Sequence, residues 1–200
     1  LDLAFENNGY EIVFVNECKK CFIEAYKFSR KNLLIQEPRL GYSNKNAMVY
    51  TQGKNKKRLI RMIQEEKEKG NVVGFIGGPP CPDFSVGGKN KGITGENGRL
   101  TKTYFDLIVR CKPDFFLFGN VKGLVKTEKH KIFYNEMKMK VTHSGYVISD
   151  RVVNALSYGV PQFRERILMI GFDEEKFKRE AIYNVDEKNY FNFPWGKYKR

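Results

Sequence analysis

The order of hydrophobic and polar positions predicts short strands alternating with helices along most of the chain. Compact apolar runs that end at polar residues or glycine are typical of buried strands. Such runs lie at residues 12–15, 72–76, 115–118, 146–153 and 166–171. Apolar residues spaced three or four apart, as in amphipathic helices, occupy residues 1–5, 18–30, 55–69, 100–112 and 128–141. This alternation predicts an α/β fold.

Turn-forming residues mark the ends of three predicted helices. Gly9 and Gly70 follow the first and third helices as C-caps, and Pro113, which has no N–H, stops the fourth. The side chains expected to face inward are Phe22, Ala25, Tyr26 and Ser29 in the second helix and Leu59, Ile60, Met62 and Ile63 in the third. Residues 31–54 are polar and irregular, and the last two strands are expected to be antiparallel.

Composition narrows the choice of partners. Lys and Arg number 36 against 23 Asp and Glu, which gives a formal net charge of +13. Such a surplus favours an acidic partner, with nucleic acid first and an anionic membrane second. No apolar run is long enough to cross a bilayer, and no secretory signal is recognisable. We therefore expect a soluble, cytoplasmic protein.

The cysteines and histidines do not predict a metal or disulfide site. Cys18 and Cys21 form a C-x-x-C, but no second pair or histidine cluster completes a zinc site. We expect both to pack in the core or on a helix face. His130 and His143 receive no predicted role.

Cys81 is the clearest candidate for chemistry. It follows the predicted strand 72–76 and the turn Gly77-Gly78-Pro79-Pro80. Proline fixes φ and restricts the residue before it, so this turn would hold the thiol in one place. Open α/β sheets bind their ligands at the carboxyl ends of strands. A positioned thiol there predicts covalent nucleophilic catalysis.

The segment after Cys81 is rich in glycine from residue 86 to 98 and is too long for a simple connection. It has neither the G-x-x-x-x-G-K-[ST] pattern nor a G-x-G-x-x-G that opens a helix after a strand, so nucleotide triphosphate binding is not expected. A mobile lid is the favoured interpretation, and a solvent loop without function is the alternative.

Several motifs occur in a fixed order over residues 1–172. They are G-G-P-P-C-x-D-F-S at 77–85, G-R-L at 98–100, N-V-K-G-L at 120–124, N-A at 154–155 and Y-G-V-P-Q-x-R-x-R at 158–166. Together they resemble the DNA (cytosine-5) methyltransferases. The resemblance implies a Rossmann-like, doubly wound and mostly parallel sheet with a late antiparallel strand, the fold of S-adenosylmethionine-dependent methyltransferases.

The resemblance also implies a reaction. The Cys81 thiolate would add to carbon 6 of cytosine, and carbon 5 would then take the methyl group of S-adenosylmethionine. In the family pattern Arg166 reaches the cytosine O2, and Arg164 organises the nucleophile and the phosphate. A free thiol is only a few per cent ionised at neutral pH, so nearby arginines would activate Cys81.

The resemblance assigns binding residues as well. Glu17 would bond the cofactor ribose, and Pro79 and Leu100 would line the cofactor pocket, whereas the expected adenine-contacting aspartate is not recognisable. The residues expected at the substrate are Ser85, Lys89, Arg99, Asn120, Val121 and Gln162. The lid would close over a cytosine flipped out of double-stranded DNA.

One position departs from the family pattern. The family has a glutamate immediately before Asn-Val, as the group that protonates cytosine N3, and this chain has Gly119. Glycine has no side chain to donate a proton, and a positioned general acid contributes roughly 10²–10⁴-fold to a rate. We therefore expect a catalytically weakened enzyme.

The predicted organisation is a catalytic core at residues 1–172, without the family's first cofactor strand and glycine turn. A basic, aromatic extension follows at 173–200, either leading toward a target-recognition domain or packing on the surface. A second polypeptide could supply the missing parts. A bacterial restriction–modification enzyme is the leading hypothesis. The alternatives are an RNA cytosine-5 methyltransferase, a non-catalytic nucleic-acid-binding or regulatory paralogue, and a thiol hydrolase, for which no histidine base is recognisable.

Overall fold

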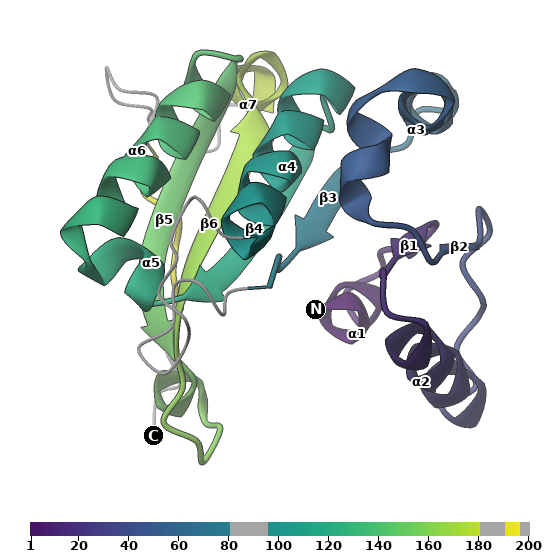
Figure 1. Cartoon of the computed structure of the whole chain (residues 1–200), viewed down its shortest axis with the longest axis horizontal. Coiled ribbons are helices and arrows are strands. Elements are labelled where there is room, and N and C mark those ends of the chain that lie inside the picture. Colours follow the sequence, from purple (N-terminus) through teal and green to yellow (C-terminus); the bar gives the residue numbers. More distant parts are fainter. Residues whose placement is uncertain (81–95, 181–190, 197–200) are drawn as a thin grey trace. The chain divides into compact units, whose positions relative to one another are not determined.

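The computed structural model describes residues 1–80, 96–180 and 191–196, shown in Figure 1. The chain divides into two compact units, Leu1–Arg58 and Leu59–Arg200. Helix α3 (Gly53–Glu68) begins in the first unit and continues into the second. No helix within the described ranges has the length and apolar character needed to cross a membrane.

The first unit contains two short parallel strands and their helices. Its elements are α1 (Asp2–Glu6), β1 (Val15–Asn16), α2 (Lys20–Asn32), β2 (Tyr42–Ser43) and the 3-10 helix η1 (Ala47–Thr51). Val15 pairs with Tyr42 and Asn16 with Ser43. The strand predicted at residues 12–15 is thus present but shorter, and β2 arises inside a segment expected to be irregular.

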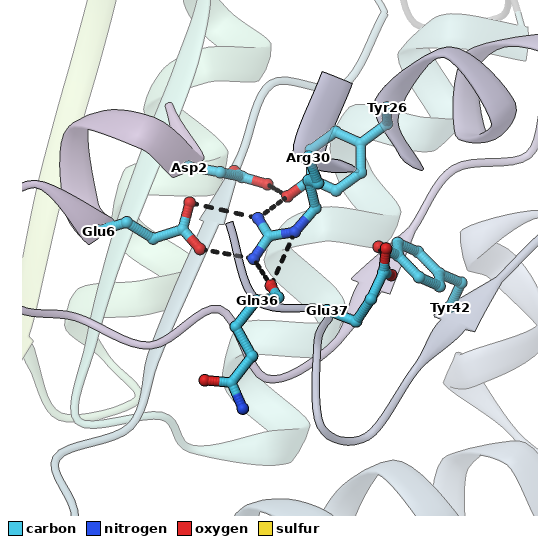
Figure 2. Close-up of polar contacts among 7 residues, drawn as sticks. All are labelled: Asp2, Glu6, Tyr26, Arg30, Gln36, Glu37 and Tyr42. Carbon is cyan, nitrogen blue, oxygen red and sulfur yellow. Dashed lines mark hydrogen bonds and ion pairs between the residues drawn. The ribbon is translucent and has the colours of Figure 1, made fainter. Parts of the chain in front are cut away.

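Helix α2 forms as predicted, but its buried face differs from the expected one. Ile23 and Arg30 are buried, whereas Phe22 is 55% exposed and Ala25 and Ser29 are exposed. The reason is a polar contact between α2 and α1, drawn in Figure 2. The Arg30 guanidinium pairs with both carboxylate oxygens of Glu6, at 2.7 and 3.2 Å. The spacing of apolar residues cannot reveal a helix face that is buried because a charged side chain forms an ion pair there.

The second unit contains a four-stranded sheet. Its strands are β3 (Gly74–Gly77), β4 (Phe115–Val121), β5 (Tyr146–Asn154) and β6 (Glu165–Asp173), arranged in the order β3-β4-β6-β5. Strand β6 is antiparallel to both β4 and β5, and β3 is parallel to β4. Three strands therefore run in one direction and β6 runs against them, which confirms the predicted mostly parallel sheet with a late antiparallel strand.

Helices cover both faces of this sheet. Helices α4 (Glu96–Cys111) and α6 (Glu128–Thr142) lie side by side over one face in Figure 1, and the short α5 (Gly123–Lys126) precedes α6. Alternate β4 residues Phe116 and Phe118 point into this core, and both are fully buried. Gly171 on β6 makes room there, because a Cβ at that position would lie 2.2 Å from a Phe116 ring carbon.

The opposite face is covered by α7 (Glu174–Glu180) and by the segment around Phe191. Phe177 and Phe191 pack with Val147 there, and the Phe191 N–H donates to Ile148 O at 3.1 Å. Further along, the Trp195 indole N–H donates to Ser149 Oγ at 3.2 Å. The described part of the extension predicted at 173–200 thus packs on the sheet.

The boundaries of β3, which precedes Cys81 in the sequence, and of β4, which contains Gly119, differ from the predicted ones by a few residues. Strand β3 begins at Gly74, two residues later than expected, and Val72 is 65% exposed. Strand β4 continues to Val121, beyond the predicted end at residue 118. The extension matters because it places Gly119, Asn120 and Val121 inside a strand rather than in a loop.

Candidate functional site

The ends of β3 and β4 meet at the carboxyl edge of the sheet in the second unit. Gly77 ends β3 opposite Phe118, and β4 continues for three more residues. A Cβ at Gly78 would lie only 3.2 Å from Gly119 O, so the chain that leaves β3 passes close to the backbone of β4. This is the edge at which open α/β sheets bind ligands.

Asn120 connects the two strand ends. Its side chain is only 4% exposed, and its Oδ1 accepts a hydrogen bond from Val121 N at 2.8 Å. Its Nδ2 donates to Pro79 O at 3.4 Å. A buried polar group is costly unless it is hydrogen-bonded, and both ends of this amide have partners. Asn120 therefore fixes the turn that precedes Cys81.

Strand β6 begins beside the end of β4. Arg166 lies opposite Val121, is half-buried, and donates from Nη1 to the adjacent Glu165 carbonyl at 2.7 Å. The Glu165 carboxylate pairs with Lys122 Nζ at 2.6 Å. This ion pair joins the residue after β4 to the first residue of β6, and it leaves Arg166 as a guanidinium without a carboxylate partner in any described contact.

Asn154 holds the base of the turn that carries Gln162 and Arg164. Its Oδ1 accepts hydrogen bonds from Leu156 N at 3.1 Å and from Arg164 N at 3.2 Å. Gln162 and Arg164 are both exposed. Because β6 starts at Glu165, Arg164 precedes the strand and only Arg166 lies within it.

Gly119 lies in the middle of this edge, opposite Leu168 of β6. A Cβ there would lie 3.3 Å from Leu168 Cδ2, a tight contact with the end of a flexible side chain. The backbone of Gly119 does not have a positive φ. A Cβ at this position therefore requires the Leu168 side chain to shift by a few tenths of an ångström.

Glu17 lies in the first unit, immediately after β1. It is half-buried, and its Oε1 accepts a hydrogen bond from Lys19 N at 2.8 Å. Burial and the Glu17 charge raise the pKa of the neighbouring Cys18 thiol. A carboxylate held at the carboxyl end of a parallel strand can accept hydrogen bonds from a pair of ribose hydroxyls, so Glu17 fits the predicted cofactor.

The other candidates divide between described and undescribed parts of the chain. Pro79 and Leu100 are half-buried in the second unit, and Leu100 and the exposed Arg99 lie near the start of α4. The predicted residues Cys81, Ser85 and Lys89 lie outside the described residues. So does the predicted lid, apart from residues 96–98, which belong to α4.

Sequence reasoning missed the roles of two groups at this edge. Asn154 was noted only as part of a motif, although asparagine before a helical turn is a common cap and is one here, for η4 (Ala155–Tyr158). The pairing of Lys122 with Glu165 had no local signal, because 43 residues separate the two. Only the register of β4 against β6 brings them together.

The cysteine and histidine predictions have mixed outcomes. Cys18 and Cys21 are both exposed at the start of α2, so the expected core packing is wrong. Cys18 precedes α2, and Cys21 lies in its first turn. His130 is buried, with Nδ1 3.4 Å from Gly123 O. In the described part of the chain no three His, Cys, Asp or Glu residues are grouped as metal ligands.

Comparison with known families gives a match over almost the whole chain. The sequence model of the family described as C-5 cytosine-specific DNA methylase matches residues 1–199. Type II methyltransferase M.NmeDI of Neisseria meningitidis serogroup C is 46% identical over 194 residues, which are 97% of this chain and 46% of that protein. Type II methyltransferase M.FnuDI of Fusobacterium nucleatum is 33% identical, over 94% of this chain and 48% of its own length.

Solved structures show the same fold. The crystal structure of a candidate DNA modification methyltransferase from an E. coli prophage matches with a TM-score of 0.60 at 21% identity, covering 90% of this chain and 44% of that one. The Spodoptera frugiperda DNMT2 mutant structure matches with a TM-score of 0.54 at 20% identity, over 86% of this chain and 46% of that one. The chain spans about half the length of the curated relatives it matches.

Proposed function

Because the chain belongs to the C-5 cytosine-specific DNA methylase family, we propose that it forms part of an enzyme that methylates carbon 5 of cytosine in DNA. The family match over residues 1–199 is the observation that carries this proposal. The net charge of +13 supports a nucleic-acid substrate. The relatives named type II methyltransferases favour a role in restriction–modification.

Cys81 is the proposed nucleophile. Its thiolate forms a bond to carbon 6 of the flipped cytosine, and the displaced electron pair makes carbon 5 nucleophilic. Carbon 5 then takes the methyl group, which leaves S-adenosylhomocysteine behind. Loss of the carbon 5 proton to water lets the carbon–sulfur bond break, and this releases the Cys81 thiolate and the methylated base. The hydrogen bond from Asn120 to Pro79 O supports this assignment, because it fixes the turn that leads to Cys81.

The arginines after Asn154 are proposed to orient the base and the DNA backbone. Arg166 is half-buried beside the end of β4, as a residue that reaches cytosine O2 would be. Arg164 and Gln162 are exposed, as residues that contact phosphate or the bases beside the target would be. A guanidinium suits both tasks, because its fork of donors matches carbonyl and phosphate oxygens. We assign Val121, Arg99, Ser85 and Lys89 to the same substrate surface.

Glu17, Pro79 and Leu100 are proposed to hold S-adenosylmethionine, which supplies the methyl group when bound. Glu17 offers a half-buried carboxylate for hydroxyl donors. Pro79 and Leu100 offer half-buried apolar surface, which suits the uncharged parts of that molecule. The domain division, with a core at 1–172 and an extension at 173–200, also stays a prediction.

Gly119 is proposed to slow the reaction, because no side chain there can protonate cytosine N3 as the thiolate adds. We predict that Gly119→Glu raises the rate of methyl transfer by about 10²-fold or more, the contribution of a positioned general acid. A Cβ at position 119 would lie 3.3 Å from Leu168 Cδ2, the end of a flexible side chain that can shift. The measurement is transfer of labelled methyl from S-adenosylmethionine to unmethylated duplex DNA by the intact protein.

Two controls make this experiment decisive. Gly119→Gln has nearly the same volume but a much weaker acid, so it reports the effect of filling the site alone. Cys81→Ser should abolish transfer in either background. An equal gain from Gln and Glu, or none from either, would contradict the missing-acid hypothesis. Transfer to RNA in place of DNA would select the RNA methyltransferase alternative.

Gly119 also favours a second candidate, a non-catalytic nucleic-acid-binding or regulatory protein. Tight binding of DNA together with no methyl transfer by either Gly119 or Gly119→Glu protein would select it. A second polypeptide as a partner stays a prediction, and co-purification with the protein from its native source tests it.

A further inference from the structure

Two asparagine side chains join the ends of β1 and β2 in the first unit. Asn16 donates from Nδ2 to Ser43 O at 3.1 Å and to Lys45 O at 2.8 Å. In the opposite direction, Asn44 donates from Nδ2 to Glu17 O and to Cys18 O, both at 2.9 Å. Asn16, the last residue of β1, therefore bonds to the end of β2 and the turn after it, and Asn44, the first residue after β2, bonds to the turn after β1.

Asn44 acts on the turn that carries the candidate ribose-binding carboxylate. Glu17 N donates to Ser43 O at 3.1 Å, and Glu17 O accepts from Asn44. The Glu17 carboxylate in turn accepts from Lys19 N, two residues further along. The backbone of Glu17 is thus held by β2 on one side and by Asn44 on the other, before α2 begins.

The contribution of Asn44 is to position this turn rather than to stabilise the fold. Asn44 is exposed, and so is Cys18, whose carbonyl accepts one of the two bonds. Water can replace an exposed hydrogen bond at little net cost in stability. Water does not, however, hold two successive carbonyls at fixed positions, and both hydrogens of one amide do so here.

We propose that Asn44 is a positioning residue for the cofactor, acting through Glu17. By holding the Glu17 and Cys18 carbonyls, it sets the direction in which the Glu17 carboxylate meets the ribose hydroxyls. This inference rests on the proposed function, in which Glu17 bonds the ribose of S-adenosylmethionine. A residue that follows β2 thus orients the Glu17 carboxylate that follows β1.

Binding of S-adenosylhomocysteine to the intact protein, measured by titration calorimetry, tests the inference without any turnover. Asn44→Ala is expected to weaken binding about tenfold, the effect of losing a hydrogen-bonded support. Asn44→Asp removes both donors and turns an anion toward two carbonyls, so it should weaken binding at least as much. Asn46→Ala is the matched control, because its side chain caps only η1, through Met48 N, and binding should stay within twofold.

A mutant cycle distinguishes positioning from a separate contact. If Asn44 acts through Glu17, Asn44→Ala should add nothing to the loss of binding caused by Glu17→Ala. The thermal midpoint and the affinity for DNA should be unchanged in Asn44→Ala, and KM for S-adenosylmethionine should rise while kcat stays constant.

Each other outcome overturns a definite statement. Three results would overturn the positioning role alone. They are unchanged binding by Asn44→Ala, an equal loss of affinity in Asn46→Ala, and a full additional loss of affinity when Asn44→Ala is added to Glu17→Ala. Unchanged binding by Glu17→Ala would overturn the ribose assignment and the positioning role that depends on it. No binding by the unsubstituted protein would overturn the proposed function together with this inference.

Discussion

Asn120 shows how one buried polar side chain can organise the candidate site. Both ends of its amide have partners, one in its own strand and one in the turn after β3. The sequence placed this residue in a motif but gave it only a substrate role. The structure adds a second reason for an amide here, since no apolar side chain of similar size could make both bonds.

Asn120→Ala should cost about 1–3 kcal/mol of unfolding free energy, because Pro79 O and Val121 N, both on half-buried residues, each lose a partner. Methyl transfer should fall further than folding alone explains, since the turn before Cys81 is no longer held. Urea unfolding and the transfer assay measure the two effects. Asn8→Ala, which removes an exposed bond to Ala4 O, is the control and should change neither. A loss of stability with full activity per folded molecule would contradict the positioning of this turn.

At the scale of elements, α1 and α2 are joined by charge rather than by an apolar face. Arg30 is 4% exposed, pairs with Glu6, and donates from Nε to Gln36 O at 3.0 Å. Tyr26, one turn before it, donates to Asp2 at 2.5 Å and accepts from Arg30, as Figure 2 shows. Burial and the hydrogen bond to Asp2 raise the pKa of the Tyr26 hydroxyl. The first helix therefore depends on this network.

Arg30→Ala should destabilise the first unit by about 3 kcal/mol, because removing one partner of a buried pair leaves the other charge uncompensated. Hydrogen exchange of the α1 and α2 amides, together with urea unfolding, measures the loss. Arg30→Lys keeps the positive charge but not the forked set of guanidinium donors, so it should retain only part of the unfolding free energy that Arg30→Ala loses. Arg39→Ala is the control, because its pair with Glu11 is exposed and should contribute less than about 1 kcal/mol. Equal effects of Arg30→Ala and Arg39→Ala would disprove the role of the network.

At the scale of the whole second unit, Asp114 ties together α3, the segment before β3 and α7 at the amino end of β4. Its carboxylate is buried and lies 2.9 Å from Lys67 Nζ on α3 and 2.6 Å from Lys176 Nζ on α7. It also accepts from Val73 N at 2.8 Å. Burial opposes its ionisation, but the two ammonium groups and the Val73 N–H outweigh burial and hold the pKa of Asp114 below its ordinary value of 3.8.

A carboxylate whose pKa is lower in the folded than in the unfolded protein stabilises the folded state at any pH above the unfolded pKa. This stabilisation is lost as the pH falls through the pKa of the folded state. The difference in unfolding free energy between the unsubstituted protein and Asp114→Asn should therefore be constant above about pH 5 and shrink as pH falls below 3.8. Urea unfolding between about pH 2.5 and 7 measures this difference on both sides of the transition. Glu24→Gln, in an exposed pair with Lys20, should show no such dependence. A difference that grows on acidification would contradict the sign of the shift.

The sequence predicted the elements of the site better than their contacts. The periods of α3, α4 and α6, the antiparallel pairing of the last strands, and the approach of the Gly-Pro turn to the sheet edge could all be read from consecutive residues. The polar face of α2 could not, because Arg30 and Glu6 become partners only after two helices pack. The support of Asn44 for Glu17 depends in the same way on the pairing of β1 with β2.

The sequence by itself determined the α/β class, the order of the longer strands and helices, and the motifs that place this chain among cytosine-5 methylases. Each of these depends on residue type and on spacing within a short window. Only the tertiary structure decided that Asn120 holds the turn before Cys81, that Gly171 admits the Phe116 ring, and that a side chain at position 119 would meet Leu168. These contacts join residues dozens of positions apart, and strand register and core packing bring them together.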